Sequence, residues 1–214
     1  MAITVLLSLL LLWPISANSG IKNFLKGGSA SHQKEVDIYE LSLDDNLYTP
    51  ELNKEKEAAA ITDFQMSIAR SLKKDKYNVE LMREGEVIVV TIAAGQLFSP
   101  NDTVLTDLGK LVLKPFIKYL KTPDLYKMIL VMHSDNTGSN AYTLNLSKSR
   151  VDAVSDWIGS VASTDNVVPY ALGSVEPLLP NNSIENRKKN RRLEIYLVPS
   201  NVMIKQARGG KINL

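Results

Sequence analysis

The chain has 214 residues, of which 44% are hydrophobic, so it can form one domain of ordinary size with extensions. Its formal charge of only +2 argues against a protein built for bulk binding of nucleic acid. The absence of cysteine excludes disulfides, thiolate metal sites, a cysteine nucleophile and a lipid-bearing cysteine in this sequence. Two histidines, His32 and His133, are too few for a histidine-rich metal site, and we expect no metal or cofactor.

The beginning of the chain is almost wholly apolar from Ala2 to Ala17. This run is short for a membrane span of about 20 residues, and its length suits a signal peptide. A core helix of a soluble protein is disfavoured because the run is apolar all round. Residues 1–20 are therefore predicted to be a signal peptide or a membrane anchor. We favour cleavage near Asn18 to Ile21, although no Lys or Arg precedes the apolar run.

Residues 21–76 are predicted to be a linker followed by an amphipathic helix. The polar stretch from Lys22 to about Asn53 contains Gly-Gly-Ser and has little periodicity, which is typical of a linker. From Glu55 to Lys74, apolar residues recur every three or four positions, as in a helix with one apolar stripe. We expect this stripe to pack on the following domain.

Two strands joined by a tight turn are predicted from Val79 to Met82 and from Val87 to Ala94. A helix should follow from Leu105 to Leu120. Thr106 is its expected N-cap, and Pro115 should kink or shorten it.

A buried strand is predicted from Tyr126 to His133, followed by a polar loop and by a helix that runs to about Val161. A short strand should then cover Pro169 to Gly173, and a loop with a helical turn should follow. The last strand should have one buried face, formed by Leu193, Ile195 and Leu197. Residues 200–214 are predicted to be a mobile basic tail.

This order of elements predicts an α/β fold, in the form of an α+β sandwich. The sheet would be mixed, in the order strand–helix–strand–helix–strand–strand (βαβαββ), with the helices on one face. We expect Val131, Val154 and Ile195 to lie in the core between the sheet and the helices. Residues 77–199 would form this domain.

The most informative stretch runs from Met132 to Arg150. A loop that leaves the carboxyl end of a strand is where open α/β sheets tend to bind ligands. This loop carries an acid, Asp135, and the helix after it carries a base, Arg150. Such a pair could hold a ligand that has both an ammonium and a carboxylate. Taken alone, Asp135 is better explained as a loop acid that caps the next helix or satisfies backbone N–H groups.

His133 and Ser147 beside this acid do not predict a hydrolase, because nothing like a nucleophile elbow is present. We expect His133 to be a structural residue that hydrogen-bonds the loop.

Two blocks of the sequence resemble the OmpA C-terminal family, which includes OmpA, Pal and MotB. The first follows the pattern His-Thr-Asp, Gly, Tyr-Asn-x-x-Leu-Ser-x-x-Arg, with His133-Ser134-Asp135, Gly138, Tyr142-Thr143 and Leu146 to Arg150. The second follows Pro-x-x-x-Asn-x-Thr-x-x-Gly-Arg-x-x-Asn-Arg-Arg-x-Glu, with Pro177, Asn181, Ser183, Asn186-Arg187 and Asn190 to Glu194. The resemblance covers roughly Tyr77 to Pro199.

The resemblance implies a non-enzymatic domain that binds peptidoglycan in the periplasm, associated with the outer or the inner membrane. The ligand would be the diaminopimelate of a stem peptide. Asp135 would accept from its ammonium, and Arg150 would hold its carboxylate through a two-toothed contact that Lys cannot make. The remaining pocket residues would be Arg191, as a second donor near the acid, Asn101, Thr137 and Phe98.

The rival interpretation is a membrane-anchored component of a motor or secretion assembly, whose OmpA-like domain docks to protein partners. A proton-conducting stator subunit is not expected, because the apolar run contains no acid.

Three departures from the family pattern bear on the site. Met132 replaces a Gly and Thr143 replaces an Asn, and both changes could weaken the pocket. Asn186 replaces a Gly, whose left-handed conformation Asn tolerates. Arg187 and Arg192 remain open as ligand contacts or as solvated or structural residues.

Overall fold

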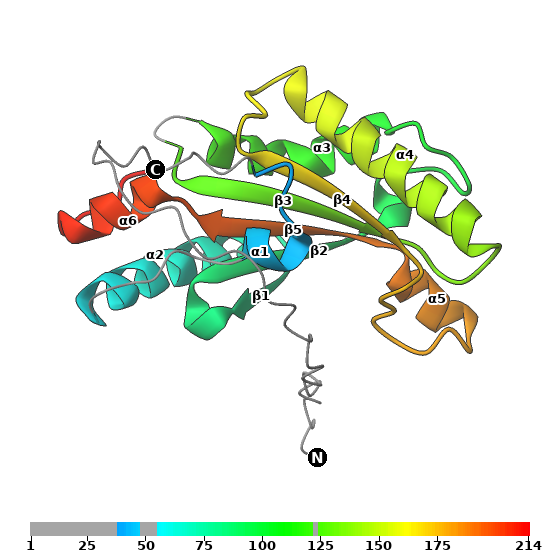
Figure 1. Ribbon diagram of the computed structural model, residues 1–214, viewed down its shortest axis with the longest axis horizontal. Coiled ribbons are helices and arrows are strands. Elements are labelled where there is room, and N and C mark those ends of the chain that lie inside the picture. The colour runs from blue at the N-terminus through cyan, green and yellow to red at the C-terminus, as the bar shows by residue number, and fades with distance from the viewer. Residues whose placement is uncertain (1–37, 48–54, 122–123) are drawn as a thin grey trace, which may run out of the picture. The chain divides into compact units, whose positions relative to one another are not determined.

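The computed structural model describes residues 38–47, 55–121 and 124–214 (Figure 1). The predicted signal peptide or anchor of residues 1–20 lies outside the described residues, as does most of the predicted linker. Within the described ranges, no helix combines the length and the apolar composition needed to cross a membrane.

Five strands form one sheet in the order β1-β2-β5-β3-β4, and the sheet is mixed, as predicted. β1 (Asn78–Met82) pairs antiparallel with β2 (Val87–Ala93). β5 (Arg192–Pro199) lies at the centre, antiparallel to both β2 and β3 (Tyr126–His133). β4 (Val167–Gly173) runs parallel to β3 at the far edge, so β1 and β4 are the edge strands. The last strand in the sequence is therefore the central strand of the sheet.

Most of the helices cover one face of the sheet, which we call the first face. They are α2 (Glu55–Lys74), α3 (Asp107–Leu113), the 3-10 helix η3 (Lys114–Leu120), α4 (Asn140–Gly159) and α6 (Asn201–Arg208). Their apolar side chains, including Val154 of α4, share one large buried cluster with alternate residues of the strands, including Ile195 of β5. The prediction that helices cover one face of a mixed sheet is confirmed for these elements.

The opposite face, which we call the second face, is also partly covered. The one-turn helix α1 (Leu43–Leu47) packs Leu43 and Leu47 against a smaller buried cluster that includes Val131 and Tyr196. The prediction that Val131 lies between the sheet and the main helices is therefore wrong, although its side chain is fully buried. For the same reason, β5 has two buried faces and not one.

Local signals in the α3 region are confirmed. The Thr106 hydroxyl accepts a hydrogen bond from Gly109 N at 3.0 Å, as expected of an N-cap. The helix changes to the 3-10 form at Lys114, one residue before Pro115. Proline has no amide hydrogen to donate within a helix, which explains the change at this point.

The expectation of a mobile tail over residues 200–214 is wrong, because α6 packs on the first face. Ser200 caps this helix, and Met203 and Ile204 are buried against the core. Arg208 Nε lies 3.3 Å from Glu57 Oε1 of α2. Met203, Ile204 and Ala207 form a narrow apolar stripe on α6, and their burial against the first face holds the segment in place.

The remaining short elements lie beside the strand ends. They are the 3-10 helices η1 (Arg83–Gly85) and η2 (Ala94–Gln96) and the helix α5 (Ile184–Asn190).

Candidate functional site

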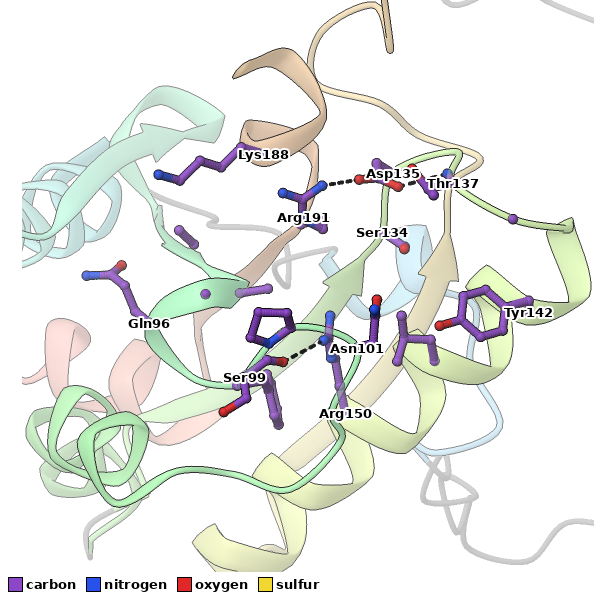
Figure 2. Close-up of a pocket in the computed structure, with 17 residues that line it drawn as sticks. Gln96, Ser99, Asn101, Ser134, Asp135, Thr137, Tyr142, Arg150, Lys188 and Arg191 are labelled. Atoms are coloured by element: carbon purple, nitrogen blue, oxygen red, sulfur yellow. Dashed lines mark hydrogen bonds and ion pairs between the residues drawn. The ribbon is translucent and has the colours of Figure 1, made fainter. Parts of the chain in front are cut away.

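The predicted site residues converge on one cavity of about 890 Å³ at the carboxyl end of β3 (Figure 2). We call it the first cavity. Its walls come from the loop after β2, the loop after β3, α4 and the end of α5. All six predicted residues line it: Phe98, Asn101, Asp135, Thr137, Arg150 and Arg191.

Arg150 reaches this cavity from α4 and is held by the loop opposite. Its Nε donates to the carbonyl of Asp102 at 2.8 Å, and its Nη2 donates to the carbonyl of Ser99 at 3.5 Å. Its Cζ lies 5.1 Å from the centre of the Phe98 ring, a cation–π distance. Burial lowers the pKa of Arg150, yet an arginine stays charged in proteins. These two hydrogen bonds use two of the five N–H donors of Arg150, so donors remain for a ligand.

The loop that receives Arg150 has an unusual backbone. Asn101 has a φ of 57°, a left-handed conformation that Asn tolerates better than most residues. Asp102 N donates to Ser99 O at 3.1 Å, and a bridge between Phe98 and Leu105 closes the loop. The turn directs the carbonyls of Ser99 and Asp102 toward Arg150. The side chain of Arg150 therefore holds the loop that carries Asn101.

Asp135 is only 3% exposed and is already paired. Its Oδ1 accepts from Thr137 N at 2.8 Å, and its Oδ2 is paired with Nη1 of Arg191. Burial alone would raise the pKa of Asp135, but the hydrogen bonds from Thr137 and the charge and hydrogen bond of Arg191 outweigh it. The pKa of Asp135 is therefore lower than usual, and the carboxylate is charged at neutral pH.

Arg191 thus faces the acid of the protein itself, with its side chain 39% exposed. Its backbone carbonyl accepts from Ala94 N at 2.9 Å, which ties the end of α5 to the loop after β2. The cavity consequently holds one fixed guanidinium, Arg150, and one partly exposed guanidinium, Arg191, on either side of it (Figure 2).

Gly138 shapes the loop between Asp135 and α4. Its φ is 109°, and a Cβ at this position would lie 2.8 Å from Cδ1 of Tyr142. Both observations require glycine here. Ser139 then caps α4 by accepting from Tyr142 N at 3.2 Å, and Tyr142 forms a wall of the cavity.

Lys188 and Gln96 are among the lining residues that the sequence did not predict. Lys188 lies on α5, three positions before Arg191, the residue that follows the last turn of this helix, and both side chains line the cavity. That spacing was readable in the sequence. Gln96 lines the cavity only because of the path of the loop after β2, and no local sequence pattern predicts that path. Among the described residues, three cations and one acid line this cavity, so it favours a ligand with net negative charge.

The departures from the family pattern lie away from the cavity lining that the structure describes. Met132 is fully buried in the first-face core. Thr143 is buried and donates to the carbonyl of Asn140 at 3.1 Å. Asn186 does not adopt the left-handed conformation that we expected, because it lies within α5, where its Nδ2 donates to Pro180 O at 3.0 Å.

Arg187 and Arg192, whose roles the sequence left open, make contacts within the fold. Arg187 Nη1 donates to the carbonyl of Asn181 at 3.0 Å, and Arg192 Nε pairs with Glu194 at 2.7 Å. His133 does not hydrogen-bond the loop as expected. It is buried, with Nε2 3.4 Å from Glu194 Oε2, because odd-numbered residues of β3 face the second face.

Comparisons with known proteins agree with this architecture. No protein-family model matches the chain. The chain is 29% identical over 112 residues to outer membrane protein A of Bordetella avium, covering 52% of this chain and 58% of that protein. It is 39% identical over 66 residues to the peptidoglycan-binding protein ArfA of Mycobacterium bovis, covering 30% of this chain and 20% of that protein. The chain therefore spans between a fifth and about three-fifths of these relatives.

Solved structures share the fold. A MotB-like protein from Desulfovibrio vulgaris superposes with a TM-score of 0.58 at 20% identity, covering 67% of this chain and 96% of that one. The cell wall anchor of the type VI secretion system from Pseudomonas aeruginosa superposes with a TM-score of 0.52 at 25% identity, covering 62% and 94%. With the two sequence blocks and the sheet order, these similarities identify the chain as containing an OmpA/Pal/MotB-like domain.

Proposed function

We propose that this domain binds peptidoglycan non-covalently and anchors a cell-envelope protein or complex to the wall. The observation that carries the proposal is the placement of Asp135 and Arg150 on two walls of one cavity. Support also comes from the similarity to a peptidoglycan-binding protein and to a cell wall anchor. The cavity contains charges that suit recognition, and the role we propose is binding and not catalysis.

The ligand group that fits is the zwitterionic centre of diaminopimelate in a stem peptide. Its carboxylate would accept from the free N–H groups of Arg150, and its ammonium would approach the Asp135 carboxylate. Because Arg191 already occupies one oxygen of Asp135, the ammonium has to share or displace that partner. The partly exposed side chain of Arg191 can then turn toward the ligand carboxylate. Asn101 and Thr137 would complete the cradle at the rim.

A second candidate function keeps the same fold but uses a different surface. Val104, Leu108 and Leu111 are large apolar residues near and on α3, spaced four and three apart, and each is more than 60% exposed. This apolar stripe favours docking to a protein partner in an envelope assembly. The domain would then be a structural component, and the charged cavity would not be its main contact.

The test is calorimetry with a muropeptide that contains diaminopimelate, supported by pull-down with purified peptidoglycan. Asp135→Asn keeps the shape but removes the charge, and Arg150→Lys keeps the charge but removes the planar fork. Each change should weaken binding by about ten- to hundredfold, since a charged hydrogen bond contributes roughly 1.5–3 kcal/mol. The two losses should not add, because a ligand released at one end is poorly held at the other.

Asp135 and Arg150 are both nearly fully buried, although both line the cavity. Arg150→Lys also loses the bond to Asp102, so its melting temperature must be measured alongside its binding. Arg208→Lys, on α6, is the matched control. If Asp135→Asn and Arg150→Lys both bind the muropeptide like the wild type, the cavity is not the wall site and the docking function becomes the better one.

A further inference from the structure

A second cavity of about 530 Å³ adjoins the first. The two cavities share Ala93 and Gln96, at the point where β2 ends and η2 begins. The rest of its lining comes from the turn between α2 and β1, the first residue of β1, the end of β2, α3, the loop before α5, α5 itself and the start of β5. The shared lining makes the two cavities neighbouring parts of one groove.

The charges of the second cavity resemble those of the first. Among the described residues, its cations are Lys76, Lys189 and Arg192, and its acid is Asp75. The charge of Arg192 is met by Glu194 at 2.7 Å, so Arg192 is committed within the fold. The two lysines are exposed and are the cations free to meet a ligand.

Helix α5 serves both cavities with consecutive residues. Lys188 lines the first cavity and Lys189 lines the second. Successive residues of a helix point about 100° apart, so neighbouring lysines diverge into the two spaces. Figure 2 shows Lys188 and Gln96 extending to the side of the first cavity that lies away from Tyr142. A chain bound at Asp135 and continuing past Gln96 would thus pass from one lysine to the next.

Lys76 occupies a position where glycine would be less strained. Its φ is 66°, and it follows the end of α2 in a Schellman arrangement, with Tyr77 N donating to Leu72 O at 3.1 Å and Lys76 N to Lys73 O at 3.0 Å. The Tyr77 hydroxyl donates to Val112 O at 2.7 Å and anchors the turn. The chain therefore holds a lysine at the mouth of the cavity despite a backbone conformation that favours glycine.

We infer that this second cavity is a further subsite, in which Lys76 and Lys189 hold a second carboxylate of an extended acidic peptide. The inference rests on the proposed function and extends it from one diaminopimelate centre to a cross-linked stem peptide. The apolar walls, Val112 and Leu178, suit the aliphatic stems of such a peptide. A glycan strand does not offer a carboxylate to Lys76 and Lys189, because the carboxylate of its sugars is used in the bond to the peptide.

The test compares two probes on four forms of the full chain, which are the wild type, two double variants and Asp135→Asn. Free diaminopimelate reaches only the first cavity, and a cross-linked dimeric muropeptide reaches both. Lys76→Gln/Lys189→Gln should bind the dimeric muropeptide about three- to tenfold more weakly than the wild type and should bind free diaminopimelate unchanged. Lys205→Gln/Lys211→Gln removes the same charge from the C-terminal region and is the matched control.

The outcomes separate this inference from the proposed function. Asp135→Asn should weaken both probes, and if it weakens neither, the proposed function fails. If Asp135→Asn weakens both probes but the two double variants bind the dimeric muropeptide equally well, the proposed function stands and the second subsite is refuted. An equal loss for both probes in Lys76→Gln/Lys189→Gln would also refute it, because that pattern indicates a general effect of charge.

Discussion

The two faces of the sheet are buried by different means. The first face is covered by α2, α3, η3, α4 and α6, and its cluster consists of hydrophobic side chains. The second face is covered, within the described residues, by the single turn of α1 and by a small apolar cluster. Beside that cluster lies a set of interacting polar groups, which are Asn46, Lys127, His133, Arg192, Glu194 and the hydroxyl of Tyr196. Asn46, His133 and Arg192 are buried, and Lys127 and Glu194 are partly buried.

This difference indicates that the faces contribute to the fold in different ways. Apolar burial is strong but not directional, so the first face supplies most of the stability. Hydrogen-bonded polar groups contribute less net free energy but require defined partners. On the second face, individual polar contacts therefore determine the positions of the strand ends next to the ligand site.

The largest expected effect comes from removing apolar volume on the first face. Ile195 is buried at the centre of β5, opposite Val90 and Leu130. Ile195→Ala should lower the free energy of unfolding by about 2–5 kcal/mol. The matched change on the second face, Ile129→Ala, should cost less because the short helix α1 can shift to fill the space. Urea denaturation of both variants measures this, and equal losses would remove the distinction between the faces.

The next effect concerns the charge buried on the second face. Burial alone would raise the pKa of Glu194, but contact with His133, the charge of Arg192 and the hydroxyl of Tyr196 lower it to about 2, from an ordinary 4.5. The charged carboxylate therefore stabilises the fold fully above about pH 4.5, and this stabilisation is lost as the pH falls toward 2.

Glu194→Gln should consequently cost about 1.5–3 kcal/mol at pH 7. The cost should shrink as the pH is lowered from 4.5 toward 2. Denaturation measured across this range tests the expectation. A cost that does not change with pH would show that the carboxylate contributes by its shape and not by its charge.

A smaller effect is expected where α1 is attached. Asn46 Nδ2 donates to the carbonyl of Ile38 and to the hydroxyl of Tyr170, both at 2.6 Å, and its Oδ1 accepts from Lys127 Nζ at 2.9 Å. Asn46→Ala should cost about 1–2 kcal/mol, because it leaves buried groups without partners. Amide hydrogen exchange should rise across α1 and stay unchanged in α4. Unchanged exchange in α1 would mean that Leu43 and Leu47 alone hold it.

The smallest effect is expected for an ion pair in solvent. Lys148 Nζ lies 2.8 Å from Asp152 on α4, with both side chains largely exposed. Lys148→Ala should change stability by at most about 0.5 kcal/mol, the usual value for such a pair on a helix. Thermal melts at low and high salt measure it. A loss comparable to that of Glu194→Gln would show that exposure does not explain the difference between the two pairs.

Elements with a clear local pattern were predictable from the sequence. The helix over Glu55–Lys74 and the strand over Tyr126–His133 have the predicted bounds, because their periodicity extends over many residues. α1 was missed because two leucines, Leu43 and Leu47, are too few to form a recognisable apolar pattern. Their role is visible only in the fold, where they pack on the second face. α6 was misread because its apolar stripe of Met203, Ile204 and Ala207 is short and is interrupted by Lys205.

The candidate site was predictable to the level of which residues meet. All six residues that the family resemblance implied as site residues line the first cavity. Their contacts were not predictable, because Asp135 and Arg191 are 56 positions apart and pair only in the fold. Likewise, the bonds from Arg150 to the carbonyls of Ser99 and Asp102 depend on the turn at Asn101, which no side-chain pattern encodes.

The two outer strands have a consequence for how this domain can meet other molecules. An exposed strand edge offers backbone groups to which a further strand can add, which is a route to aggregation. In β4, Pro169 has no amide hydrogen to offer such a strand. In β1, the strand is five residues long and carries the exposed acid Glu80. Both edges are therefore poor templates for strand addition, and association of this domain has to use side-chain surfaces.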